Sequence, residues 1–492
     1  MTNPQTLLGR SAELKELSEF ATAKKAGFTY VRGRRRVGKS TLLKELQRTI
    51  PHVFYFFGAD DSTTKGLLNS FAEQWDRFTG KTRLTELKTL TWNRIFSEIS
   101  SHVGQCKIGL VLIFDEIQWI AKTKSGCTGA LKEAWLDWER LEVKVIICGS
   151  SNKFFLQKTG SEEAILRGLK TRSDIWIHPF SLGQVKKFYF PKWKNEEVAL
   201  TYMMLGGVPY YLNRINNPSR GFIQCLNDAI FTQDAIFLEE IDEVLRLEFK
   251  EHGLKTAKTI LSCLGQSGTS QAEIQKITGL ALTTVVHSLE SLSNYGLVFQ
   301  KIPAHRKKQN EAGALYFMKD FYLNFYFQVL LAYKSKIESN RNKGLLFPQV
   351  FANNNRHYFI QNFTGKSFEL LVRYILERKT TPDPALHQRL HLRDHEYDVL
   401  SYWDQQTEID ILVEHQKDRI ARIIECKWIS PDNNEGSKYL EELINKKYIP
   451  HPTYSIKRYL CLSKDTPPQL KAKAEEKGVT LICLEHLFDE QS

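Results

Sequence analysis

The chain has 492 residues, of which 42% are hydrophobic and 25% charged, so it is long enough for several domains and too apolar for a disordered protein. It carries 68 Lys and Arg against 56 Asp and Glu, and the net charge of +12 favours contact with polyanions, although a basic surface can also serve solubility alone. The sequence shows no signal-peptide core, no apolar run near the roughly 18 residues of a membrane-spanning helix, and no Cys-x-x-Cys pair. We therefore expect a multidomain cytoplasmic protein without a membrane segment.

The first predicted element pair is a strand and a helix joined by a phosphate-binding loop. Phe28–Arg32 has a strand pattern, and the residues after Ser40 have helical spacing. Glycines let backbone N–H groups converge on phosphate, Lys39 would reach the β and γ phosphates of ATP, and Ser40 would ligate Mg²⁺. Three arginines inside the loop could touch phosphate or DNA, or form a solvated rim. The predicted nucleotide-binding residues are Gly33, Arg34, Arg35, Arg36, Val37, Gly38, Lys39, Ser40 and Thr41.

The next chemical signal is a pair of carboxylates at the end of an apolar run, residues 109–114. Such a run is typical of a parallel strand buried on both faces. Asp115 would hold Mg²⁺ through water, and Glu116 would polarise the water that attacks the γ-phosphate. A surface turn is the alternative. A third strand, Val143–Cys148, precedes Ser151 and Asn152, which are candidates for sensing the γ-phosphate.

Six motifs together resemble a known family. They are residues 8–13, the loop at 33–40, Phe-Asp-Glu-Ile-Gln at 114–118, Cys-Gly-Ser-Ser at 148–151, Pro-Phe-Ser-Leu at 179–182 and Gly-Gly-Val-Pro-Tyr-Tyr at 206–211. Over roughly residues 5–240 the chain resembles the archaeal-type ATPases of the STAND branch of AAA-like proteins. The resemblance implies a nucleotide-binding α/β core, a helical lid and a regulated switch. The usual Gly-Arg before the Pro-Phe-Ser segment is replaced here, which leaves Arg167 and Arg172 as candidates for contacting the γ-phosphate.

The middle of the chain predicts three short helices and a β-arm. Gly279 suits the turn between the second and third helices, and Thr283 and Thr284 are polar residues near the start of the third. The pattern resembles a winged helix–turn–helix whose wing carries Arg306, Lys307 and Lys308. The third helix would lie in a DNA major groove with the wing on phosphates, or the module would dock another protein domain. The predicted core positions are Ile260, Leu261, Leu264, Ile274, Ile277, Val285, Leu289 and Leu292.

The aromatic-rich segment 315–327 favours core packing, and a polar stretch near 353–356 suggests a boundary. Beyond it, a helix from Gly365 carries Glu369 near its start, and a predicted hairpin places Asp410 on one strand with Glu425 and Lys427 on the next. Strand alternation points Glu425 and Lys427 the same way. Asp410, Glu425 and the backbone carbonyl of Cys426 could hold Mg²⁺, and Glu369 could complete the site from the helix. Lys427 would position or activate water towards a phosphodiester.

This order resembles the PD-(D/E)xK nuclease core and the domain of unknown function often fused to such ATPases. An ion-paired sheet without metal is the alternative. We also expect a helix at Lys438–Lys447 and buried strands at 459–462 and 479–483.

The sequence thus predicts an α/β protein in which ATP controls a metal-dependent DNA endonuclease. The alternative is a STAND-type switch that binds DNA or a protein partner and carries an inactive nuclease fold. ATP, Mg²⁺ and DNA are the expected ligands, and a homo-oligomer is compatible with the family. The predicted segments are an ATPase core at 1–180, a helical lid at 181–250, a winged helix–turn–helix at 251–310, a connecting segment at 311–355 and a nuclease-like domain at 356–492.

Overall fold

The structure is a computed structural model in which the chain forms two compact units, Met1–Pro179 and Phe180–Ser492. Each unit is described by itself. The residues described are 8–59, 63–107, 109–121, 125–150, 171–232, 235–246, 249, 251–265, 268–304, 314–340, 344, 346–347, 357–378, 385–392, 396–404, 406–429, 433–447, 453–463 and 466–488.

The first unit is built on a five-stranded sheet in the order β2-β3-β4-β1-β5, and every pairing in it is parallel. This confirms the predicted parallel α/β core. The strands are β1 (Gly27–Arg32), β2 (Val53–Phe57), β3 (Val111–Asp115), β4 (Lys144–Gly149) and β5 (Thr171–Trp176). The described helices are α1 (Ser11–Thr22), α2 (Lys39–Thr49), α3 (Thr64–Thr79), α4 (Trp92–Cys106), α5 (Ile117–Ile120) and α6 (Cys127–Trp138).

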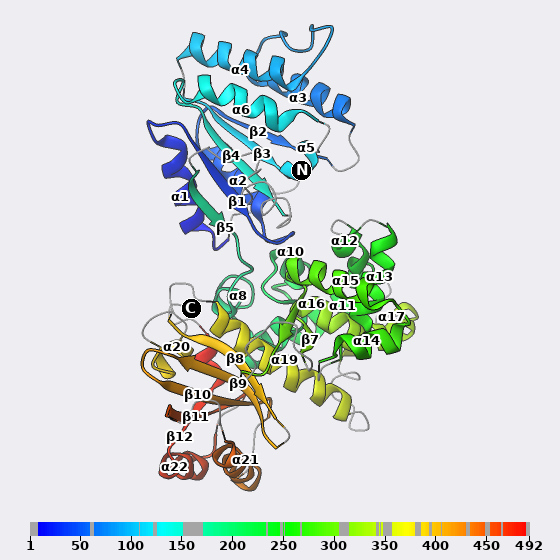
Figure 1. The fold of residues 1–492 in the computed structure, drawn as a ribbon, viewed down its shortest axis with the longest axis vertical. Coiled ribbons are helices and arrows are strands. Elements are labelled where there is room, and N and C mark those ends of the chain that lie inside the picture. Colours follow the sequence, from blue (N-terminus) through cyan, green and yellow to red (C-terminus); the bar gives the residue numbers. More distant parts are fainter. Residues whose placement is uncertain are drawn as a thin grey trace. The chain divides into compact units, whose positions relative to one another are not determined.

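Both faces of this sheet are covered by helices (Figure 1). One face packs on α1 and α2, and the opposite face packs on α3, α4 and α6 through an aromatic-rich core. Because both faces are buried, β3 and β4 read as continuous apolar runs rather than alternating ones. The carboxyl ends of the strands therefore form the edge where polar residues gather.

The second unit begins with short helices and continues into a helical bundle followed by an antiparallel strand pair. The first helices are α8 (Leu182–Phe188), α9 (Asn195–Leu205), α10 (Pro209–Ile215), α11 (Phe222–Ile230) and α12 (Glu240–Arg246). The bundle and pair are α13 (Glu251–Cys263), α14 (Gln271–Thr278), α15 (Leu282–Asn294), β6 (Val298–Lys301) and β7 (Leu315–Met318). This order agrees with a winged helix–turn–helix, while Arg306, Lys307 and Lys308 lie outside the described residues.

Most predicted core positions of the bundle are buried, but Ile277 is not. Ile274 is 0% exposed, whereas Ile277 is 64% exposed, so that prediction was wrong. Three residues turn a side chain by about 60° around a helix, and Ile277 lies in the last turn of α14, next to the end at Gly279. Gly279 itself has φ 69°, which confirms the predicted glycine turn.

The aromatic segment is core, as predicted. It forms β7, α16 (Phe321–Phe325) and the start of a π-helical turn (Tyr326–Leu330), which α17 (Leu331–Glu338) follows. Tyr322 and Phe325 are fully buried in a cluster that also includes side chains from the short helices and from α19 (His357–Glu377). This segment therefore packs the helices of the second unit together.

The C-terminal part is a mixed five-stranded sheet in the order β12-β11-β10-β9-β8. The hairpin β9–β10 is antiparallel, as predicted, and β10, β11 and β12 are parallel. The strands are β8 (Asp398–Trp403), β9 (Glu408–His415), β10 (Ile420–Lys427), β11 (Ser455–Leu462) and β12 (Val479–Cys483). The remaining helices are α20 (Ala385–Arg389), α21 (Asn433–Asn445) and α22 (Pro468–Glu476).

Helix α19 packs on one face of this sheet, and α21 and α22 pack on the other (Figure 1). The helix expected from Gly365 begins at His357, so Glu369 lies in its middle and not near its start. Among the described helices, none is long and apolar enough to cross a membrane.

Candidate functional site

The loop between β1 and α2 has the backbone that a phosphate cradle requires. Arg36 and Gly38 adopt positive φ angles of 68° and 95°. Gly33 lies so close to the chain that an added Cβ would be 2.2 Å from the carbonyl oxygen of Ile177, which only glycine avoids. Helix α2 has no side-chain cap at Gly38, so its first amides remain available for an anion.

Lys39 lies inside this loop. Its side chain is 4% exposed, and Nζ donates to the carbonyl oxygens of Gly33 at 2.9 Å and Arg34 at 3.0 Å. Carbonyl oxygens are neutral acceptors, so a nucleotide phosphate would be a stronger partner for the ammonium group. The position fits the predicted contact with the β and γ phosphates.

A buried arginine anchors the loop from outside. Arg10 donates to the carbonyl oxygens of Val37 at 3.2 Å and His178 at 2.6 Å, and its other nitrogen contacts Glu13 at 2.9 Å. From the sequence, residues 8–13 contributed only to the family resemblance. The structure shows that Arg10 ties the loop to the segment after β5.

Asp115 ends β3 and is 0% exposed. Its carboxylate accepts hydrogen bonds from the Tyr55 hydroxyl at 2.6 Å and from the Glu116 backbone N–H at 2.9 Å. Burial and the nearby Asp115 raise the pKa of Tyr55. The Tyr55 hydroxyl thus helps to orient Asp115, one of the two predicted Mg²⁺ ligands.

Glu116 is held by two further neutral donors. It adopts a positive φ of 52°, and its carboxylate accepts from Ser150 Oγ at 3.0 Å and from the Gln118 amide. Tyr55, Gln118 and Ser150 had no predicted role in this site, although Gln118 and Ser150 lie in the motifs that carried the resemblance. Ser151, Asn152 and the side chains of Arg167 and Arg172 lie outside the described part of the chain.

The nucleotide-site residues fit ATP with magnesium. The loop offers uncapped amides and one buried ammonium group, while Ser40 and Asp115 provide the oxygen ligands that Mg²⁺ prefers. Among Arg34, Arg35 and Arg36, the second is exposed and the others are half-buried. Thr41 is exposed at the start of α2.

The second candidate site is a carboxylate cluster, defined here as Glu369, Asp410 and Glu425. Register in the β9–β10 hairpin pairs Ile411 with Ile424, which brings Asp410 next to Glu425. Asp410 Oδ2 accepts from the backbone N–H of Cys426 at 3.0 Å. The hairpin therefore positions these acids as the sequence predicts.

Lysines pair with two acids of the carboxylate cluster. Glu425 contacts Lys427 at 2.8 Å and also Lys446, which follows α21. Glu369 contacts Lys301 of β6 at 2.6 Å and Lys366 at 3.1 Å. Lys301 and Lys446 had no predicted role in this site, because their partners lie 68 and 21 residues away on other elements. Lys366 also had none, although it lies three residues before Glu369 on α19 and its spacing could have indicated the pair.

The three acids of the carboxylate cluster differ in how far nearby lysines neutralise their negative charge. Burial, Glu425 and Glu369 raise the pKa of half-buried Asp410 to about 7. Burial alone would raise the pKa of Glu369, but Lys301 and Lys366 outweigh it and lower the value to about 2. Burial would lower the pKa of Lys427, yet Glu425 and Asp410 raise it. Asp410 is therefore the acid that a cation would stabilise most.

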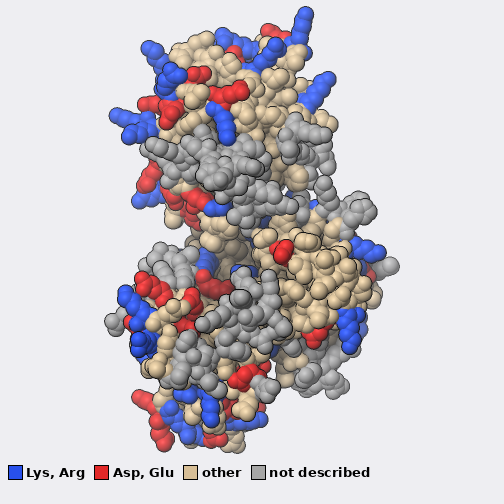
Figure 2. All heavy atoms as spheres, viewed as in Figure 1, with Lys and Arg blue, Asp and Glu red and all other residues tan. Residues whose placement is uncertain are grey.

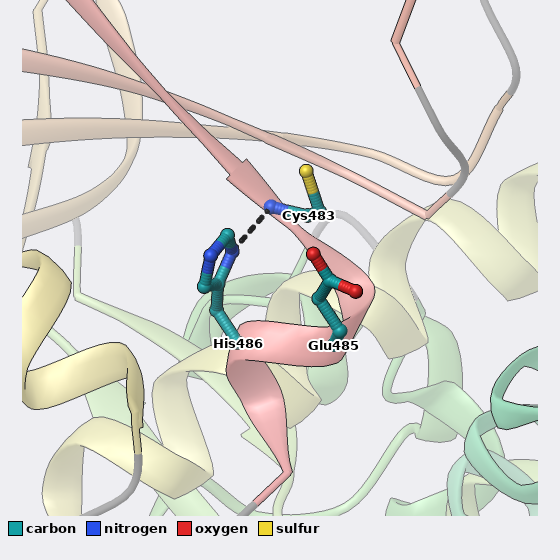
Figure 3. Close-up of side chains that lie close together, drawn as sticks. All are labelled: Cys483, Glu485 and His486. Atoms are coloured by element: carbon teal, nitrogen blue, oxygen red, sulfur yellow. Dashed lines mark hydrogen bonds between the residues drawn. The ribbon is translucent and has the colours of Figure 1, made fainter.

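The donor types in the carboxylate cluster suit Mg²⁺, but their placement does not form one metal-sized site. Among the described residues, the group of three ligand atoms within 4.8 Å is Cys483, Glu485 and His486 (Figure 3). His486 Nδ1 there accepts from the Cys483 backbone N–H at 2.9 Å, so that ring caps a short helical turn. A shared cation would require Glu369 and Glu425 to leave their lysines.

Basic side chains are dispersed. On the face drawn in Figure 2, Lys and Arg alternate with Asp and Glu in each unit, and the described residues form no continuous basic patch there. On this face, the basic residues behind the net charge of +12 thus do not form one surface for binding a polyanion.

Comparisons with known proteins agree with the first site. Residues 7–215 match a family described as an ATPase domain predominantly from Archaea, and residues 326–459 match one described as Archaea bacterial proteins of unknown function. The chain is 24% identical over 476 residues to the uncharacterized protein MJECL04 of Methanocaldococcus jannaschii, covering 96% of this chain and 98% of that protein. The family match over residues 7–215 therefore supports the predicted resemblance to archaeal-type ATPases, and the nuclease resemblance stays a prediction.

Two solved structures are similar over about two thirds of the chain. The Walker-type ATPase of Pyrococcus abyssi is 15% identical, with 66% of this chain and 96% of that chain covered and a TM-score of 0.46. The ORC2 protein of Aeropyrum pernix is 12% identical, with 68% and 96% covered and a TM-score of 0.45.

Proposed function

We propose that this chain is an ATP-hydrolysing switch whose nucleotide site is formed by the β1–α2 loop and the end of β3. One observation carries the proposal: Lys39 is buried inside the loop, while Asp115 and Glu116 accept hydrogen bonds from neutral donors and so keep their negative charge available. A matching ATPase family model over residues 7–215 supports the same function.

Each residue has a distinct task in this proposal. Lys39 and the first amides of α2 bind the phosphates, and Ser40 and Asp115 hold magnesium. Magnesium, when bound, neutralises charge on the transferred phosphate. Glu116 accepts a proton from the attacking water, and its hydrogen bonds from Ser150 and Gln118 orient the carboxylate.

A phosphate-release assay tests this function. Purified protein should hydrolyse ATP in the presence of Mg²⁺, and the signal should vanish when EDTA removes the metal. If no nucleoside triphosphate is hydrolysed or bound by the full chain, the proposal is overturned.

The second candidate function is metal-dependent cleavage of DNA by the C-terminal domain. The favouring observation is the half-buried Asp410, placed beside Glu425 with Lys427 on the same hairpin. Lys427 would position water towards a phosphodiester. The ion pairs at Glu369 and Glu425 support the alternative, in which this domain binds DNA without cutting it and the ATPase acts as a regulator.

Supercoiled plasmid separates the two alternatives. With Mg²⁺ and ATP, a nuclease should convert it to nicked or linear form, and Asp410→Asn should stop cleavage while ATP hydrolysis continues. Retarded migration without cleavage would leave DNA binding as the role of this domain.

A further inference from the structure

A pocket lies where the β6–β7 hairpin meets α19, within the second unit. Its charged and aromatic lining residues are Phe299, Lys301, Phe317, Lys366, Glu369 and Arg373. The hairpin also reaches the C-terminal sheet, because the Ala304 backbone N–H donates to the Ser401 carbonyl oxygen of β8 at 2.9 Å. The pocket is therefore assembled from two predicted domains.

Two lysines converge on one carboxylate in this pocket, and an arginine lines the same pocket. Lys301 and Lys366 contact Glu369 at 2.6 and 3.1 Å. Arg373, one helical turn along α19, is 5% exposed, and its Nη1 lies 3.8 Å from Glu377. Its Nη2 donates to the carbonyl oxygens of Leu400 and Asp410 and to Ser401 Oγ, while its Nε is buried without a hydrogen-bond partner among the described residues. A buried guanidinium donor left unmatched beside two ammonium groups favours an additional anionic acceptor.

The hairpin holds Lys301 in place before any ligand arrives. The rings of Phe299 and Phe317 stack with centroids 5.5 Å apart, and Lys301 Nζ lies 4.4 Å from the centroid of Phe317. Gly268 packs so closely against Phe317 that an added Cβ would be 2.4 Å from the ring. Because the ring is confined, the ammonium group above it has little freedom to turn to solvent.

We propose that this pocket is a phosphate-binding subsite in which Lys301, Lys366 and Arg373 bind a phosphate group of a DNA strand, displacing the Glu369 carboxylate. A phosphate oxyanion offers the same charge and more acceptor atoms than a carboxylate. Displaced Glu369 then becomes free to join Asp410 in holding a cation. The inference rests on the proposed action of the C-terminal domain on DNA. Free phosphate and mononucleotides carry the same anionic phosphate group, so the experiments below distinguish these ligands from a DNA strand.

Inorganic phosphate tests the subsite directly. The titration uses the full chain carrying Lys39→Ala, which removes the lysine of the nucleotide site, and calorimetry measures the remaining phosphate binding. Adding Lys301→Met should weaken that binding at least about tenfold, because a charge-assisted contact is lost. Adding Glu369→Gln should strengthen it, because the competing internal anion is removed. Lys334→Met is the matched control, since Lys334 contacts Glu338 at 3.6 Å and does not line the pocket.

The opposite expected effects of Lys301→Met and Glu369→Gln on phosphate affinity distinguish a phosphate subsite from a purely structural ion pair. If Lys301→Met and Glu369→Gln both leave phosphate affinity unchanged, or if both weaken it, the subsite is overturned. Circular dichroism checks folding, and Lys366→Met replaces Lys301→Met if the latter does not fold, with the same expected loss.

A labelled DNA duplex then identifies the source of the phosphate. Lys301→Met should weaken duplex binding several-fold compared with Lys334→Met when the subsite serves a DNA strand. If the wild-type protein binds inorganic phosphate in this pocket but neither binds nor cuts DNA, the pocket is a site for free phosphate. The proposed action of the C-terminal domain on DNA is then rejected. If duplex affinity falls while phosphate affinity does not, Lys301 acts only by positioning the hairpin and the subsite is overturned.

Discussion

The two candidate sites both gather carboxylates, yet the groups that contact those carboxylates differ. In the first unit, Asp115 and Glu116 accept hydrogen bonds from neutral groups, namely a tyrosine hydroxyl, a serine hydroxyl, an amide side chain and a backbone N–H. In the second unit, Glu369 and Glu425 are each paired with two lysines.

The difference decides which site is ready for a cation. A neutral donor orients a carboxylate and leaves its full negative charge, so a metal can bind without breaking an ion pair. A lysine ammonium group already neutralises its partner, and a buried pair is costly to separate. The nucleotide site is thus preorganised, whereas the carboxylate cluster needs a rearrangement before it can share a metal ion.

The largest expected effect is at the preorganised site. Glu116→Gln should reduce ATP hydrolysis about 100-fold or more while Mg·ATP still binds, because the amide cannot accept the proton of the attacking water. Phosphate release and fluorescent-nucleotide binding measure the two properties. Lys39→Ala is the companion variant and should weaken binding itself.

Loss of nucleotide binding in Glu116→Gln would contradict the division of roles. It would mean that the carboxylate holds the fold of the loop instead of the water.

Asp410→Asn tests whether the charge of Asp410 in the carboxylate cluster lacks a neutralising partner. The pKa of Asp410 is raised from 3.8 to about 7, so the folded state favours the protonated acid and loses stability as the pH rises through that range. An asparagine resembles the protonated acid and avoids this loss. The variant should therefore be about 1–2 kcal/mol more stable than wild type at pH 8, with little difference below pH 4.

Hydrogen exchange of peptides from β9 and β10 measures this local stability without unfolding the first unit. Slower exchange in the variant at pH 8, and no difference at low pH, is the expected result. An equal change at both pH values would show that the effect comes from packing and not from charge. Adding Mg²⁺ to wild type at pH 8 should slow exchange in the same strands.

The local sequence predicted the helices, strands and loops that carry both sites better than it predicted which side chains contact the site residues. The loop at Gly33–Ser40 and the hairpin carrying Asp410 and Glu425 were readable because each signal lies within one or two neighbouring elements. The contact between Lys301 and Glu369 joins residues 68 positions apart, and no periodicity records such a pairing. Ile277 shows the same limit, since its spacing suits the core but the end of α14 leaves it exposed.

Tyr55→Phe probes a neutral donor in the nucleotide site. Removing the hydroxyl takes one hydrogen bond from buried Asp115, and a loss of about 1 kcal/mol corresponds to a roughly fivefold weaker response to Mg²⁺. ATP hydrolysis measured over a Mg²⁺ titration should show the midpoint moving to higher concentration. Tyr439→Phe in the second unit is the control and should leave the midpoint unchanged.

The smallest expected effect is that of Ser150→Ala. Ser150 Oγ and the Gln118 amide both donate to the same Glu116 oxygen, so either one can orient the carboxylate when the other is removed. The single variant should lower ATP hydrolysis only about twofold, because the net value of one shared hydrogen bond is small. Combining Ser150→Ala with Gln118→Ala should lower it by more than the product of the two single effects, since the double variant removes both alternatives. A simple product of the two effects would mean that the donors act independently, and the neutral-donor account of Glu116 would then need a different orienting group.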